Sequence, residues 1–116
     1  MVFQVNTSIL DACVLSALRY DDAYGYVLTQ RIRETFELSE STLYPVLRRL
    51  QKTGFLRVYD ENFGGRNRRY YSITEQGREQ DKLNQAAWKE FKSRVDKFIE
   101  EKKPAKSAKG GDTNDK

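Results

Sequence analysis

Apolar residues recur at helical spacing near the middle of the chain. Leu43, Val46, Leu47 and Leu50 stand at i, i+3, i+4 and i+7, so they share one face of a helix. Gly54 follows them and is suited to the left-handed conformation that commonly ends a helix. The pattern therefore predicts an amphipathic helix with one buried face, which we refer to as the recognition helix.

The remaining face of the recognition helix is polar and basic. Ser39 or Ser41 is placed to cap its start. Hydroxyl groups and cations of this kind reach base edges and phosphates when a helix binds DNA. The candidate DNA-contacting residues of this segment are Ser39, Ser41, Thr42, Tyr44, Arg48, Arg49 and Lys52.

Two strand patterns follow directly. Leu56 and Val58 share one face of residues 55–59, and Tyr71 and Ile73 share one face of residues 69–74. The tip between them, residues 62–68, is basic and has two glycines suited to positive φ. Helix, strand, basic tip and strand are the sequence form of a winged helix-turn-helix, whose hairpin holds the DNA beside the recognition helix. The candidate contacts of this wing are Gly64, Gly65, Arg66, Asn67, Arg68, Arg69 and Tyr70.

Two further helices precede the recognition helix. The first is capped by Asn6 or Thr7 and extends to about residue 20, with a wide apolar stripe. Residues 21–23 are expected to form a turn, and a short link at residues 37–38 should join the second helix to the third. The second helix covers about residues 24–36, with inward side chains expected at Tyr24, Val27, Leu28, Ile32 and Phe36.

The last helix is capped by Thr74 and is expected to run to about residue 103, where a proline follows. Its apolar residues recur at heptad spacing, so burying them requires another chain, the first helix of the same chain, or both. We expect a homodimer. The candidate dimerisation and effector residues are Leu10, Val14, Trp88, Phe91, Lys92, Val95, Phe98 and Ile99. The predicted organisation is a winged helix at residues 1–74, a dimerisation helix at 75–103 and a disordered tail at 104–116. The fold class is mostly α with a small β-hairpin wing, an α+β arrangement.

The amino-acid composition argues against several classes of function. The 116 residues include no histidine and a single cysteine, Cys13, which excludes an intrachain disulfide and a Cys/His metal cage. The commonest general base is also missing, so we expect no enzyme, no cofactor and no metal. The net charge is +4, and residues 39–69 hold seven cations against three acids. Without a signal-peptide pattern or an apolar span, we expect no membrane partner and a cytoplasmic, nucleoid-associated location.

Two longer blocks are more specific than the periodicity. The first reads Thr-Leu-Tyr-Pro-Val-Leu-Arg-Arg-Leu at residues 42–50, with Gly-Phe-Leu at 54–56. The second, at residues 64–78, reads Gly-Gly-Arg-Asn-Arg-Arg-Tyr-Tyr-Ser-Ile-Thr-Glu-Gln-Gly-Arg. Together they resemble the PadR family of bacterial transcriptional regulators, in its short form with a single C-terminal helix. The resemblance reaches from the first helix to about residue 99. It implies a winged-helix homodimer that represses transcription, often of a transporter or detoxification gene.

The resemblance also implies a candidate ligand. In short members of the family, the dimer encloses an aromatic-lined cavity that binds flat hydrophobic compounds. The stacking tryptophan there immediately precedes a Ser-Arg-Val-Asp-Lys stretch. This chain has that stretch at residues 93–97, but Lys92 precedes it and Trp88 lies one turn earlier. Either the cavity is absent here or its small hydrophobic ligand is different.

Two functions from different classes remain. The first is a sequence-specific repressor on a pseudo-palindromic DNA operator, because dimer symmetry spaces two recognition helices about one turn of DNA apart. The second is a winged-helix protein-interaction module, since the fold alone does not decide between them. Steep weakening of binding with salt would indicate DNA, because counterions are released when cations neutralise phosphates.

Overall fold

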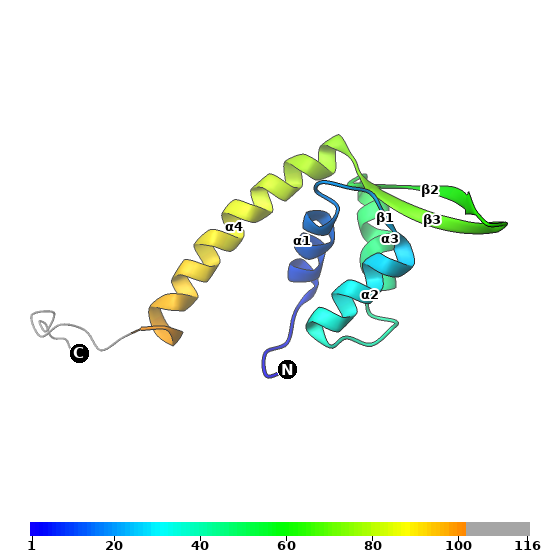
Figure 1. Ribbon diagram of the computed structural model, residues 1–116. Coiled ribbons are helices and arrows are strands. Elements are labelled where there is room, and N and C mark those ends of the chain that lie inside the picture. Colours follow the sequence, from blue (N-terminus) through cyan, green and yellow to red (C-terminus); the bar gives the residue numbers. More distant parts are fainter. Residues whose placement is uncertain (102–116) are drawn as a thin grey trace, which may run out of the picture. The chain divides into compact units, whose positions relative to one another are not determined.

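The computed structural model describes residues 1–101 as four helices and one three-stranded antiparallel sheet (Figure 1). The elements in chain order are α1 (Thr7–Ala17), β1 (Ala23–Tyr24), α2 (Gly25–Phe36), α3 (Leu43–Thr53), β2 (Leu56–Phe63), β3 (Arg66–Ile73) and α4 (Glu75–Ile99). The predicted winged helix-turn-helix with a long last helix is confirmed. The expected helix end near residue 103 and the tail at 104–116 lie outside the described residues.

The chain forms two compact units. The first covers residues 1–84, and the second begins at residue 85, with α4 continuing across the boundary. The first turns of α4 therefore belong to the same unit as the winged helix, whereas the sequence pattern predicts a boundary after residue 74.

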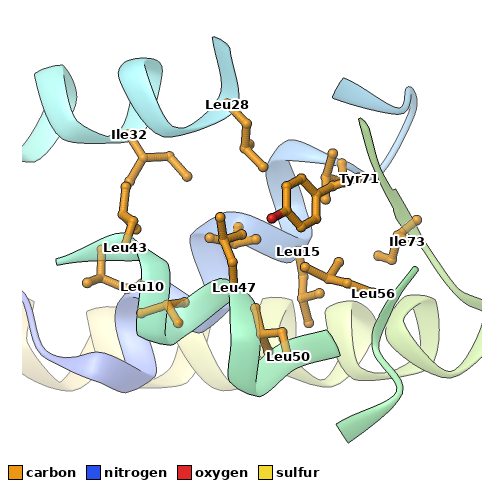
Figure 2. Packing of buried hydrophobic residues seen from close by; sticks show 13 residues of the cluster. Leu10, Leu15, Leu28, Ile32, Leu43, Leu47, Leu50, Leu56, Tyr71 and Ile73 are labelled. Atoms are coloured by element: carbon orange, nitrogen blue, oxygen red, sulfur yellow. The ribbon is translucent and has the colours of Figure 1, made fainter. Parts of the chain in front are cut away.

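The core of the first unit forms between the apolar faces of α1, α2 and α3 and the base of the sheet. Figure 2 shows Leu28 and Ile32 of α2 reaching toward the apolar face of α3. The predicted face of α3 is confirmed, since its four apolar side chains are at most 3% exposed. Leu15 is fully buried although the pattern did not single it out, and Val27, predicted inward, is 56% exposed.

The local sequence correctly predicts some of the helix ends and not others. The Asn6 side chain accepts a hydrogen bond from the Ile9 amide (3.0 Å) and caps α1, as predicted. Gly54 ends α3 with φ of 93°, also as predicted. The start of α3 differs, because Thr42 is the N-cap residue and makes no capping bond, so the expected cap from Ser39 or Ser41 is wrong. The link between α2 and α3 occupies residues 37–42 and is longer than predicted.

The sheet has the order β1-β3-β2, so β3 is its central strand. The hairpin of β2 and β3, which we call the wing, is paired from Leu56 opposite Ile73 to Phe63 opposite Arg66. Its turn is only Gly64 and Gly65, both with positive φ (53° and 80°), as two-residue hairpin turns require. The predicted tip at residues 62–68 was therefore too wide. Strand β1, predicted as a turn, pairs with β3 at residues 70–71.

A tight joint connects the wing to α4. The Thr74 hydroxyl accepts a hydrogen bond from the Gly77 amide (3.0 Å) and donates one to the Gly54 carbonyl (2.6 Å). The predicted Thr74 cap is therefore confirmed. Gly77 is buried so closely against the backbone of Phe55 that an added Cβ would not fit. The glycine that weakens the helix locally is required by this packing.

A buried carboxylate fixes the same part of α4 to α1. Asp81 is 3% exposed and accepts hydrogen bonds from Arg19 Nε (2.6 Å) and the Ser16 hydroxyl (2.9 Å). The hydrogen bond to Asp81 raises the pKa of Arg19. Because a buried charge needs a close partner, this network holds the first turns of α4 against the end of α1.

Candidate nucleic-acid interface

The outward face of α3 carries the predicted contact residues. Tyr44 is 60% exposed, and Arg48 and Lys52 are exposed on the side opposite the buried leucines. Arg49 differs, because its guanidinium forms an ion pair with Asp11 of α1. Arg49 and Arg48 were both predicted to contact DNA, but the structure directs Arg49 toward α1.

The hydroxyl residues precede α3 rather than forming its first turn. Ser39 and Ser41 are exposed, and Thr42 is partly buried. The hydroxyl oxygens of Ser39 and Thr42 lie 2.8 Å apart, within hydrogen-bond distance. These side chains therefore stand at the N-terminal end of the recognition helix, next to Tyr44.

The wing arginines have different surroundings. Arg66 is exposed at the end of the two-glycine turn. Arg68 lies over the rings of Tyr24 (4.9 Å) and Phe63 (5.0 Å), so part of its role is packing. Arg69 faces Asp60 across the hairpin at 3.8 Å, and both side chains are largely exposed, so this pair contributes little stability. Asn67 is exposed beside them.

Tyr70, a candidate contact of the wing, packs against other aromatic rings. It stacks on Tyr59 with ring centroids 5.6 Å apart and contacts Tyr24 at 5.8 Å. The three rings come from three different strands, so they form a row across the sheet. The sequence pattern missed this row because β1 was not predicted.

A hydrogen bond holds the wing to the segment before β1. The Tyr59 hydroxyl donates to Asp22 Oδ2 (2.7 Å). This bond raises the pKa of Tyr59 to about 12 and lowers the pKa of Asp22, because it favours the protonated phenol and the ionised carboxylate.

A cavity of about 230 Å³ lies among α2, α3 and β3, and we call it the α2–α3 pocket. Burial raises the pKa of Tyr71, one of its lining residues, while the nearby positive charge of Arg69 acts in the opposite direction. None of the α2 residues that line it was among the predicted DNA contacts. Among the lining residues are Tyr26, Thr29, Arg33, Glu40, Tyr44 and Arg69.

The second unit presents an apolar surface on α4. We call Trp88, Phe91, Val95, Phe98 and Ile99 the α4 seam. Trp88 and Phe91 are half exposed, with ring centroids 6.2 Å apart, and Val95 is partly buried. Phe98 and Ile99 are more exposed still.

The other candidate dimerisation residues lie elsewhere. Lys92 forms an ion pair with Asp96 (3.1 Å) on the same helix. Leu10 and Val14 are 3% and 0% exposed within the first unit, so the structure places them in the chain's own core and not on an open face.

The part of the chain that the structure describes offers few other kinds of site. Across residues 1–101, no three His, Cys, Asp or Glu side chains are grouped to hold a metal ion. None of the described helices is both long and apolar enough to cross a bilayer.

Residues 14–82, which include α2, α3 and the whole wing, match the transcriptional regulator PadR-like family. The chain belongs to this family. PadR-like proteins are transcriptional regulators and not enzymes, and membership implies DNA binding.

Two solved structures and one further relative are similar to this chain. A protein from Streptococcus mutans UA159 is 30% identical with a TM-score of 0.80, covering 90% of this chain and 100% of its own. A PadR family transcription regulator from Clostridium difficile R20291 is 29% identical, with a TM-score of 0.70. The match covers 78% of this chain and 97% of that protein. An uncharacterised protein of Lysinibacillus sphaericus is 35% identical over 97 residues, which cover 78% of this chain and 88% of that protein.

Proposed function

We propose that this PadR-like protein is a sequence-specific repressor that binds a pseudo-palindromic operator as a homodimer in the cytoplasm, at the nucleoid. The observation that carries the proposal is the division of α3 into two faces. Its apolar side chains are buried, while Tyr44, Arg48 and Lys52 are exposed on the other side. A helix held in this way is free to enter the major groove.

The exposed side chains fit different parts of a DNA site. Arg48 has the guanidinium geometry for two hydrogen bonds to guanine or to a phosphate. Lys52, at the end of α3, suits a phosphate contact as a point charge. Arg66 at the wing turn would hold the flanking backbone or minor groove.

The α4 seam supports the homodimer. Exposed aromatic side chains at heptad spacing on one helix are the usual sign of a helix that pairs with another. A second copy of the same chain supplies a matching seam by symmetry. Two recognition helices would then occupy successive major grooves, about one turn of DNA apart.

The test of DNA binding starts from a random DNA library. The protein should enrich fragments that share two inverted half-sites, and its affinity for them should fall steeply as salt rises. Fragments without inverted symmetry would refute the dimer arrangement on DNA. Absence of any enrichment, or binding that is insensitive to salt, would refute the DNA-binding function.

A small hydrophobic or aromatic effector is proposed at the Trp88–Phe91 pair. A ligand wedged there would favour one arrangement of the two subunits and so change operator affinity. Planar hydrophobic compounds should quench Trp88 fluorescence and weaken operator binding together. If both signals stay unchanged across a panel of such compounds, the effector site is rejected while DNA binding stands.

A further inference from the structure

The end of the wing carries one apolar side chain. Between residues 60 and 69, Phe63 is the only residue that is neither polar, charged nor glycine. Its side chain is 45% exposed and lies outside the hydrophobic core of the first unit. Packing of the core therefore does not explain an aromatic ring at this position, and much of the ring's surface is open to a partner.

Two neighbours on β3 hold the ring of Phe63 in place. The guanidinium of Arg68 lies 5.0 Å from its centroid, and the centroid of the Tyr70 ring is 6.2 Å away. A cation over an aromatic face attracts the ring and restricts its orientation. A side chain that is already ordered loses less entropy when a partner buries it. The contact also keeps a positive charge beside the ring, where it attracts phosphates.

The turn at the end of the wing is narrow. Gly64 and Gly65 separate Phe63 from Arg66, its partner across the hairpin. Nothing lies within 4 Å of the place where either glycine would carry a Cβ. The minor groove of B-DNA is only about 6 Å wide, so a turn without side chains enters it most easily. Phe63 and the exposed Arg66 are the first side chains behind this turn, and both would follow it into the groove.

We propose that Phe63 inserts between two stacked base pairs from the minor groove beside each half-site. The proposal rests on the proposed function and adds a specificity-determining residue that makes no hydrogen bond to a base. Apolar side chains inserted from the minor groove partly unstack a base step and bend the duplex. Pyrimidine–purine steps such as TA and CA unstack easily, whereas A-tracts are stiff. Operators should therefore contain such a flexible step at a fixed distance outside each half-site.

The main test detects unstacking directly. The probe is a duplex enriched by the protein, with the fluorescent base 2-aminopurine placed at one flanking position at a time. Its fluorescence rises when the base is unstacked, so the wild-type protein should raise the signal severalfold at one position outside each half-site. Phe63→Ala should abolish this rise. Tyr20→Ala is the matched control and should retain it, because Tyr20 is an 84% exposed aromatic residue between α1 and β1, outside the proposed interface.

A second measurement concerns the preference for the step itself. Replacing the flexible step by a stretch of A·T pairs in an A-tract should weaken wild-type binding about tenfold. Phe63→Ala should bind the two duplexes with affinities that differ by less than about twofold, because it has no ring to insert. Phe63→Leu should retain most of the preference, since leucine is also an inserting side chain. A wild-type protein that binds both duplexes equally would overturn the proposal.

A purely structural role of Phe63 predicts different results. If the ring only packs on Arg68 within the hairpin, Phe63→Ala should weaken binding to both duplexes alike, and the wild-type protein should leave 2-aminopurine unchanged at every flanking position. That pair of results would overturn the insertion while DNA binding stands. Both measurements on the wild-type protein remain decisive even if Phe63→Ala fails to fold. A wild-type protein that enriches no DNA at all would instead refute the proposed function.

Discussion

Replacing Gly77 by alanine tests the joint between the wing and α4. An added Cβ would lie 2.8 Å from Ile73 Cγ1 and 3.1 Å from the carbonyl carbon of Phe55, and closer still to its oxygen. The nearest obstacle is backbone, so a side-chain rotation cannot relieve the overlap. The first turn of α4 must therefore move away from the wing.

Opposing contributions set the size of the effect. Alanine in place of glycine favours a helix by about 0.5–1 kcal/mol. Overpacking against a rigid neighbour costs about 1–3 kcal/mol, and loss of the Thr74 cap at Gly77 costs about 1 kcal/mol more. We therefore expect Gly77→Ala to lower the free energy of unfolding by about 1–3 kcal/mol, or roughly 5–20 °C in Tm.

Thermal and urea unfolding followed by circular dichroism would measure this change. All variants should be compared at one protein concentration, because the Tm of the proposed dimer would depend on concentration. Glu79→Ala is the control, since Glu79 is exposed on the same helix and should change stability by less than about 0.5 kcal/mol. An increase in stability for Gly77→Ala would show that helix propensity dominates and that the close packing is wrong.

Four further changes follow from the geometry. Arg48→Ala should weaken operator binding by about 1–3 kcal/mol, and should weaken binding to random DNA by a smaller amount, as measured by fluorescence anisotropy. Equal losses on the two DNAs would indicate that Arg48 contacts a phosphate and not a base. Arg66→Ala should weaken both DNAs alike and reduce the salt slope by about 1; an unchanged slope would remove the wing turn from the interface. Val95→Asp should yield monomers or unfolded protein in sedimentation, because a charge on the α4 seam would be buried without a partner. A folded Val95→Asp dimer would refute the role of the α4 seam in dimerisation. The hydrogen bond from Tyr59 lowers the pKa of Asp22. The bond therefore stabilises the fold above pH 3.8, the ordinary pKa of an aspartate, and this stabilisation is lost as the pH falls below that value. Urea unfolding from about pH 5 to about pH 3 should show a weaker pH dependence in Tyr59→Phe, and identical profiles would refute the bond.

Local sequence was sufficient for the recognition helix. Its four buried residues stand at helical spacing and Gly54 follows them, so the apolar pattern and the helix-ending glycine both predict the observed helix. Strand β1 could not be predicted in this way, because two residues carry no periodicity. Ala23 and Tyr24 become a strand only by pairing with β3, almost fifty positions later. The same limit explains why the row of tyrosines was missed.

The candidate interface could be outlined from the sequence, but the placement of its individual side chains could not. The basic face of α3 and the wing were identified from composition, but the separate orientation of Arg49 depends on Asp11, which is distant in sequence. Leu10 and Val14 looked available to a partner because apolar periodicity does not reveal which neighbour covers a face. The α2–α3 pocket was also out of reach, since its residues come from three elements that meet only in the fold.

The division of α3 into two faces has a consequence for how such proteins diversify. The side chains proposed to read DNA, such as Tyr44 and Arg48, are exposed, and the residues that hold the domain together are buried. After a gene duplication, substitutions on the outer face can therefore alter the recognised operator at little cost in folding. Arg49 differs from these side chains, because it pairs with Asp11 of α1, but the pair is partly exposed and its loss would cost little stability.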